Sequence, residues 1–173
     1  MCKDDAKRVI AKYRKTSPYN SSLIEGFLDF LYKEGDEVNI NRFDEILDSI
    51  ENDRVETIRR RQPPENRMSP ILICVFKNEL VRLQRFFQHY RNIGIKLFVM
   101  LDNNSSDGSR EFCMEQDDAD VFEVTHAFSS ARHVAWVNKI LEMYGRERWY
   151  LSVDADELLD YIESEHYDIS AIV

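Results

Sequence analysis

The chain has 173 residues, of which 43% are hydrophobic and 12% aromatic. That is enough for one ordinary domain with a real core plus a short appendage, and it excludes an intrinsically disordered protein. Acidic residues outnumber Lys and Arg by 32 to 23, for a net charge of -9, and no stretch gathers a basic stripe, which argues against nucleic acid as a partner.

The first part of the chain, residues 1–68, has the apolar spacing of charged amphipathic helices. In residues 41–62, for example, Phe43, Ile46, Leu47, Ile50 and Val55 fall on one helical face. The proline-rich stretch RRRQPPENRMSP then breaks the pattern, and its arginine run has the character of a solvated helix end. We therefore expect a helical N-terminal extension (1–68), which packs on a domain or a partner, and a domain that begins at residue 69.

From residue 71 onward, short apolar runs alternate with amphipathic helical patterns. ILICVF (71–76) and KLFVML (96–101) are continuous apolar runs, as expected of strands buried on both faces, and DVFEV (120–124) and WYLSV (149–153) are shorter candidates. Helical patterns separate them and end near Gly94 and Gly145, and the run YDISAIV is expected to begin a further strand. This alternation predicts an α/β fold with a mainly parallel sheet and flanking helices.

Polar segments follow each of the first four predicted strands. They are KNE (77–79), DNNSSDGS (102–109), THAFSSAR (125–132) and DADE (154–157). Each has a purely structural interpretation: a helix N-cap, a tight turn followed by a cap, or a helix that opens with acidic residues. Because ligands of parallel sheets bind outside the carboxyl ends of the strands, the four segments are also the expected place for a site.

Taken together, the segments indicate a cation site. Asp102, Asp154 and Asp156 would converge on one crevice, a costly concentration of negative charge unless a divalent cation is bound. Oxygen ligands without a Cys/His cluster favour Mg²⁺ or Mn²⁺ over zinc. These ions usually reach proteins through one or two carboxylates plus substrate phosphates, which suggests a substrate that carries a diphosphate.

The order FKNE, LDNNSSDGS, an Ala- and Arg-containing helix, and then WYLSVDADE resembles the family 2 glycosyltransferases, in particular the subgroup with a W-x-x-x-x-D-x-D-E signature. The resemblance covers residues 71–173. It implies the GT-A (Rossmann-like) fold, with 69–173 as a nucleotide-sugar-binding domain. It also implies transfer of a sugar, with inversion, from a nucleotide-diphosphate sugar (a UDP-sugar is favoured) to a glycan, lipid or protein acceptor.

The resemblance also implies roles for individual residues. Asp102 would accept a hydrogen bond from the base, the segment that contains Asn78 and Glu79 would line the base and ribose, and Asp107 would help shape that pocket. Asp154 would hold the ribose or metal-bound water, Asp156 would ligate Mn²⁺ or Mg²⁺ on the diphosphate, and Arg132 would add positive charge.

The general base of the reaction cannot be assigned in this chain. Members of the family continue well beyond D-x-D, and that second half supplies the acceptor site and the base, so we expect this chain to carry the donor-binding half. Two alternatives stay open: a non-catalytic nucleotide-binding or interaction module, and another Mg²⁺-dependent α/β enzyme. A phosphatase of the haloacid-dehalogenase type is disfavoured, because its first strand should end in D-x-D and here ends in Lys77 and Asn78.

The cysteines and the hydropathy bear on the compartment. Cys2, Cys74 and Cys113 are far apart and form no C-x-x-C pair, which fits a reducing cytoplasm better than a disulfide framework. No signal-peptide pattern and no apolar run of membrane-spanning length is evident. We therefore expect a cytoplasmic protein, with peripheral membrane association at most.

Overall fold

The structure, a computed structural model, describes residues 53–61, 63–161 and 168–171. Most of the predicted N-terminal helical extension, residues 1–52, lies outside these residues. Along the chain the elements are β1 (Glu56–Arg59), β2 (Ile71–Phe76), α4 (Leu80–Asn92), β3 (Leu97–Asp102), α5 (Ser109–Glu115), β4 (Ala119–Glu123), α6 (Ser130–Tyr144), β5 (Tyr150–Ser152) and the 3-10 helix η1 (Ile169–Ala171).

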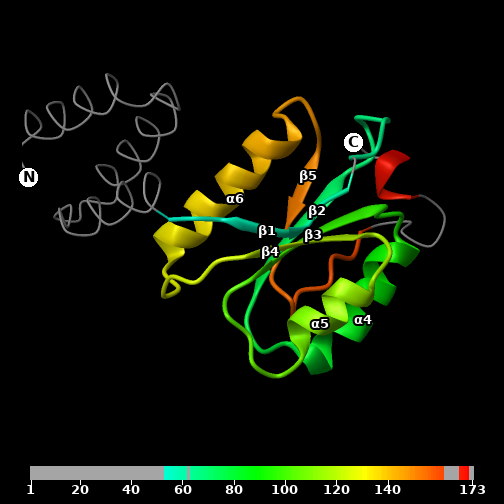
Figure 1. Cartoon of the computed structure of the whole chain (residues 1–173). Coiled ribbons are helices and arrows are strands. Elements are labelled where there is room, and N and C mark those ends of the chain that lie inside the picture. Colours follow the sequence, from blue (N-terminus) through cyan, green and yellow to red (C-terminus); the bar gives the residue numbers. More distant parts are fainter. Residues whose placement is uncertain (1–52, 62, 162–167, 172–173) are drawn as a thin grey trace, which may run out of the picture. The chain divides into compact units, whose positions relative to one another are not determined.

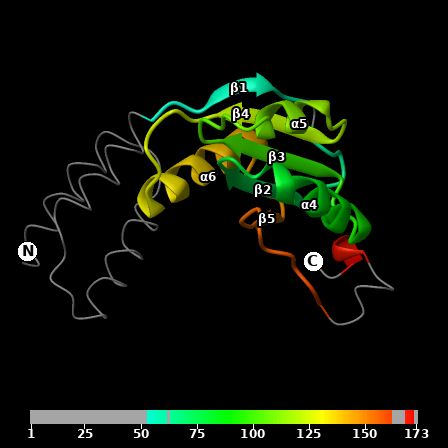
Figure 2. The same cartoon turned by 90° about the horizontal axis from the view of Figure 1, so that it is seen from below.

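The five strands form one mostly parallel sheet in the order β1-β4-β3-β2-β5, which can be followed in Figure 2. Strand β2 lies between β3 and β5 and is parallel to both, and β3 is parallel to β4. Only β1 runs antiparallel, against β4, in the described sheet. The predicted α/β architecture with a mainly parallel sheet is therefore confirmed, and it is compatible with a Rossmann-like fold.

Helices cover both faces of this sheet, α4 and α5 on one and α6 on the other (Figure 1). Alternate residues of β2 divide between the two layers. Leu72, Cys74 and Phe76 belong to the core cluster under α4 and α5, whereas Ile71, Ile73 and Val75 belong to the cluster under α6. All six residues are buried, which explains why the strand is apolar throughout rather than alternating.

The direction of the strand order reverses at β2. From β2 the chain steps through β3 to β4, and it then returns past both to place β5 on the other side of β2. Because crossovers between parallel strands are right-handed, a reversed step puts its helix on the opposite face, as α6 is. The neighbouring carboxyl ends of β2 and β5 are thus a topological switch point, where open α/β sheets bind ligands.

Strand β1 is a correction to the predicted helix over residues 41–62. Within the described part of that stretch, β1 (Glu56–Arg59) pairs with β4, with Glu56 opposite Glu123 and Thr57 opposite Phe122. The spacing of apolar residues reflects only local sequence, so it cannot reveal pairing with a strand that is distant in the chain. Thr57 and Ile58 are β-branched residues, which suit a strand. The sheet therefore begins before residue 69.

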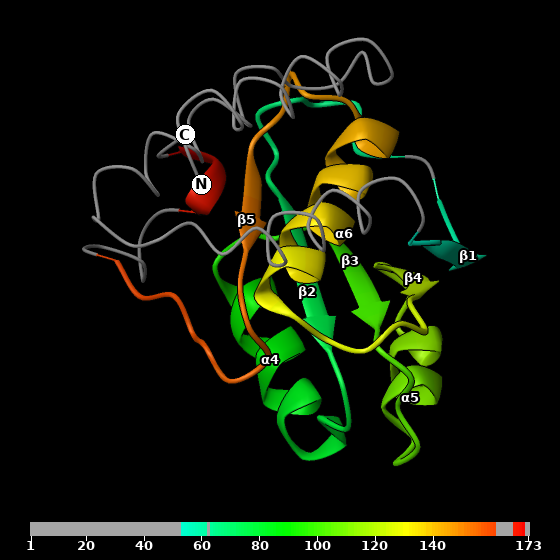
Figure 3. The same ribbon diagram turned by 90° about the vertical axis from the view of Figure 1, so that its left-hand side faces the viewer.

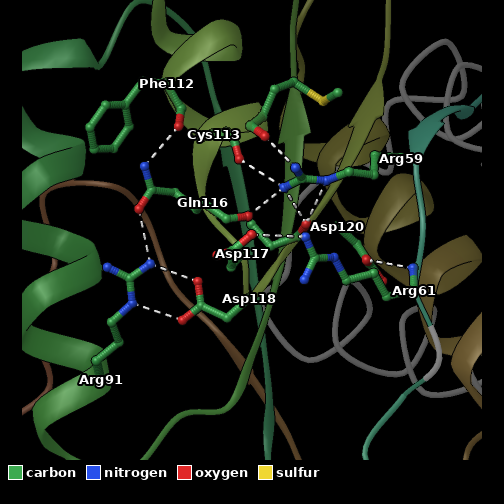
Figure 4. A network of polar contacts seen from close by, with 11 residues as sticks. Arg59, Arg61, Arg91, Phe112, Cys113, Gln116, Asp117, Asp118 and Asp120 are labelled. Atoms are coloured by element: carbon green, nitrogen blue, oxygen red, sulfur yellow. Dashed lines mark hydrogen bonds and ion pairs between the residues drawn. The ribbon is translucent and has the colours of Figure 1, made fainter.

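The arginines at the end of β1 hold the carboxyl ends of two helices. The guanidinium group of Arg59 donates to the carbonyls of Cys113 (3.1 Å) and Gln116 (2.5 Å) at the end of α5, as Figure 4 shows. Arg60 donates to the carbonyl of Met143 (2.6 Å) at the end of α6. Positive charge at a helix carboxyl end is stabilising, so Arg59 and Arg60 bind protein groups, although Arg60 is also exposed to solvent.

The expected strand in YDISAIV is also corrected. Residues 169–171 form the 3-10 helix η1. The backbone N–H of Ile169 donates to the carbonyl of Ile93 just beyond α4 (2.8 Å), and the Ile169 side chain is buried in the core beneath α4. Residues 169–171 therefore pack on a helix end instead of joining the sheet.

Candidate functional site

Asn78 joins the loop after β2 to the loop after β3. Its backbone is left-handed (φ 57°). Its N–H donates to Oγ of Ser105 (2.9 Å), and its Oδ1 accepts from the N–H of Ser106 (2.8 Å). This reciprocal pair uses the side chain of Asn78 internally and fixes the two loops to each other.

Asp107 and Ser109 cap α4 from outside the helix. Glu79, at the N-cap position, makes no side-chain capping bond of its own. Instead, Oδ2 of Asp107 accepts from the N–H of Leu80 (3.2 Å) and Oγ of Ser109 accepts from the N–H of Glu79 (2.9 Å). Hydrogen bonds from the side chain of Ser109 and from backbone N–H groups lower the pKa of Asp107. The turn expected in DNNSSDGS is present, with Gly108 at the N-cap position of α5, and Asp107 and Ser109 of the same segment also cap α4.

Asp102 lies away from solvent at the end of β3, and its carboxylate is neutralised within the protein. It is fully buried and accepts from Nε of Arg110 (2.6 Å) and from the N–H of Ser105 (2.9 Å). Arg110 also pairs with Glu123. The expected convergence of Asp102 with Asp154 and Asp156 is therefore not observed. The carboxylate of Asp102 pairs with Arg110 and does not face the crevice.

The neighbouring Asn103, and not Asp102, lies beside the pocket at the end of β3. It is buried, and its Nδ2 donates to the carbonyls of Val124 (2.9 Å) and His126 (2.8 Å). These two bonds fix which way the amide points. No hydrogen bond to its Oδ1 is present within residues 53–61, 63–161 and 168–171, so the side chain offers an oriented acceptor.

Arg132 is engaged elsewhere. Its Nε donates to Oδ2 of Asp53 (3.1 Å), a buried carboxylate that also accepts from Nε1 of Trp136 (2.7 Å). Arg132 therefore helps attach the segment before β1 to α6. The structure does not bring it to the same place as Asp154 and Asp156.

The DADE segment is a turn, and the expected alternative of a helix start is not observed. The N–H of Glu157 donates to the carbonyl of Asp154 (3.1 Å), and the Glu157 carboxylate accepts from the N–H of Asp154 (3.1 Å). Ala155 is buried in the core beneath α4, and the hydroxyl of Tyr90 donates to the carbonyl of Glu157 (3.1 Å). The buried alanine and the tyrosine hold the turn in place, while Asp154 and Asp156 are exposed.

Asp154 and Asp156 lie on a pocket of about 320 Å³ at the switch point. Volumes of this order are typical of small-molecule sites. The parallel strands whose carboxyl ends surround it are seen in Figure 3. The pocket is lined by Val75, Phe76, Lys77, Glu79, Asn103, Phe128, Asp154, Ala155 and Asp156.

Three predicted site residues are therefore brought together on the pocket, namely Glu79, Asp154 and Asp156. Asn78, Asp102 and Asp107 bind other groups of the protein, and Arg132 binds Asp53. Lys77 belongs to the segment 76–79, which the sequence had placed along the base and ribose, whereas Asn103 and Phe128 were not singled out as lining residues. A signal for Asn103 was present, since it directly follows a buried strand at the rim where ligands bind.

The donor set suits a hard divalent cation held partly by a ligand. Among the described residues, no group of three or more His, Cys, Asp or Glu side chains is arranged to hold a metal by itself. Asp154 and Asp156 nevertheless present exposed carboxylates on one pocket. Mg²⁺ commonly uses one or two carboxylates, waters and substrate phosphates, so the pair fits such an ion.

The pocket carboxylates also act on the core beneath them. Burial raises the pKa of the Cys74 thiol, and Cys113, Asp154, Glu79 and Asp156 raise it further. Burial likewise raises the pKa of Cys113 to about 12. Both thiols therefore stay protonated near neutral pH and behave as small core residues, not as nucleophiles.

In the part of the chain that the structure describes, no helix combines the length and apolar character needed to cross a bilayer.

A scan against models of known protein families finds no match to this chain, and searches of curated proteins and of solved structures find none either.

Proposed function

We propose that this chain binds a nucleotide-diphosphate sugar as the donor-binding part of a metal-dependent, GT-A-type glycosyltransferase. The observation that carries the proposal is the placement of Asp154 and Asp156, on a turn directly after β5, in the pocket at the switch point. Parallel α/β sheets bind nucleotides at this place, and a carboxylate pair there suits a cation on a diphosphate.

The two ends of the pocket differ in chemistry. Asp154 and Asp156 follow β5, whereas Asn103 follows β3, with β2 between them. Two strand spacings amount to ~10 Å. The proposed ligand therefore places its diphosphate by the carboxylates and its base by Asn103, whose Oδ1 would accept from a base N–H.

Asp154 and Asp156 would hold Mn²⁺ or Mg²⁺, which when bound stabilises negative charge on the departing nucleoside diphosphate. Lys77 also lines the pocket and would contribute a positive charge near the phosphates. Asn78 and Asp107 would act through the two fixed loops that shape the base end. The acceptor, whether glycan, lipid or protein, and the general base are not assigned to residues of this chain.

The proposal is tested by calorimetric titration of UDP, and then GDP, into the native chain with and without Mn²⁺. We expect binding that requires Mn²⁺ and is lost in Asp156→Ala. The matched control is Asp117→Ala, which removes a fully exposed aspartate from the loop before β4 and should bind as the native chain does.

Absence of nucleotide binding to the folded protein under every condition would refute the proposal. Binding that is metal-dependent, with neither sugar transfer nor donor hydrolysis when the chain is supplied with UDP-sugars, would favour the non-catalytic nucleotide-binding module instead.

A further inference from the structure

Phe128 is an exposed aromatic residue on the wall of the pocket. Its side chain is 62% exposed, although most large apolar side chains of the described sheet and helices are buried. It lies in the loop between β4 and α6 and lines the same pocket as Asn103 and Asp156. Burial of a phenyl group from water is favourable in free energy, so a planar ligand that covered this ring would be stabilised by the contact.

The loop that carries Phe128 is held at both sides. Before it, the carbonyl of His126 accepts from Nδ2 of Asn103 (2.8 Å). After it, Oγ of Ser129 caps α6 by accepting from the N–H of Arg132 (3.2 Å). The ring is thus attached to a fixed backbone, which lowers the entropy that a ligand would lose on contact with it.

The ring itself rests against α6. Its centroid lies 6.0 Å from that of His133 and 6.4 Å from that of Trp136, the latter with the planes inclined at 62°. Trp136 is fully buried, and its indole N–H is bound to Asp53. Phe128 therefore has a rigid support on the protein side while more than half of its surface faces solvent.

We infer that Phe128 is the stacking platform for the nucleobase of the ligand. The inference rests on the proposed function. An aromatic face and an oriented hydrogen-bond acceptor on one pocket wall match the two features of a base, its π-face and its polar edge. Phe128 lies only two residues beyond the carbonyl that Asn103 binds, so the platform and the acceptor can contact one base.

The test compares UDP with 5,6-dihydro-UDP in the presence of Mn²⁺. The dihydro base keeps the N3–H and the diphosphate but loses its flat aromatic ring. We expect the native chain to bind UDP about tenfold more tightly than dihydro-UDP, as base–aromatic stacking implies. In Phe128→Ala and Phe128→Leu this preference should disappear, and in Phe128→Trp it should be kept or increased.

Two controls separate this inference from the proposal on which it rests. Manganese pyrophosphate, which lacks a base, should bind Phe128→Ala as it binds the native chain, and Asp156→Ala should abolish that binding. Val134→Ala, which truncates an exposed apolar side chain of α6, should keep the preference for UDP.

Equal affinity of the native chain for UDP and dihydro-UDP would overturn the role of Phe128 while leaving the diphosphate site intact. A preference for UDP that survives in Phe128→Leu would overturn the role of Phe128 too, because it would show that any bulky apolar side chain gives the preference and that stacking is not required. If neither UDP nor pyrophosphate binds, the proposed function fails together with the inference.

Discussion

The carboxylate of Asp107 accepts a hydrogen bond from the backbone N–H of Leu80 (3.2 Å), so a residue of the loop after β3 caps the helix after β2. Caps are usually supplied from within a helix's own N-terminal segment. Here the cap also fixes one pocket-lining loop to its neighbour. Stability and the shape of the base end thus depend on the same contact.

We expect Asp107→Ala to lower the melting temperature at neutral pH. Because hydrogen bonding lowers the pKa of Asp107 in the folded state, its contribution is present above the ordinary value of 3.8 and is lost as the pH falls through the lowered pKa. The difference from the native protein should therefore shrink in acid. Thermal unfolding followed by circular dichroism across this pH range measures it, with Asp117→Ala as the control.

Removing Arg110 should be costly, because it leaves the fully buried carboxylate of Asp102 without its cation. We expect Arg110→Met to reduce the free energy of unfolding by about 3–5 kcal/mol. Urea denaturation gives the value, with the exposed Arg85→Met as the matched control. Combining Arg110→Met with Asp102→Asn should recover much of the loss, and failure to recover any would show that the pair is not the source of the effect.

Asp120 should show the opposite pH dependence from Asp107. Burial raises its pKa, although a hydrogen bond from the Tyr144 hydroxyl and the backbone N–H of Arg61 (2.7 Å) act against this. The folded state therefore binds a proton more readily than the unfolded state, and stability falls as the pH rises from 3.8 through the raised pKa.

In Asp120→Asn this loss is removed, so the variant should gain stability relative to the native protein as the pH rises through that window. Urea unfolding at a series of acidic pH values measures the difference. Asp118→Asn is the contrasting control: burial acts to raise its pKa, but Arg91 lowers it more, so this variant should lose stability relative to the native protein as the pH rises from the lowered pKa to 3.8, and the difference should stay constant over the higher window of Asp120.

Oδ1 of Asn103 predicts that the pocket prefers a base that can donate a hydrogen bond. N3-methyl-UDP lacks the N3–H donor, so the native chain should bind it at least about tenfold more weakly than UDP. In Asp102→Asn the ratio of the two affinities should be unchanged, because Asp102 is turned to Arg110. Equal binding of the two nucleotides to the native chain would contradict this reading of Asn103.

The core strands could be predicted from local sequence because burial on both faces makes them apolar throughout, as in Ile71–Phe76. The turn at Asp154 and Asp156 was also placed correctly at a strand end. Strand β1 could not be predicted, since its partner β4 lies far along the chain, with Arg59 opposite Val121. The sequence also could not show that Asn103, and not Asp102, lines the pocket. Adjacent residues at a strand end face different surroundings, and the pairing of Asp102 with Arg110 is known only from the fold.

The attachment of Arg59 and Arg60 to the ends of α5 and α6 has a kinetic consequence. The carbonyls that these arginines bind are in position only after the helices and β4 have formed, so β1 should dock late in folding. Contacts made after the transition state govern how fast a protein unfolds and not how fast it folds. The arginines of this edge strand should therefore act mainly by lowering the unfolding rate of the native protein.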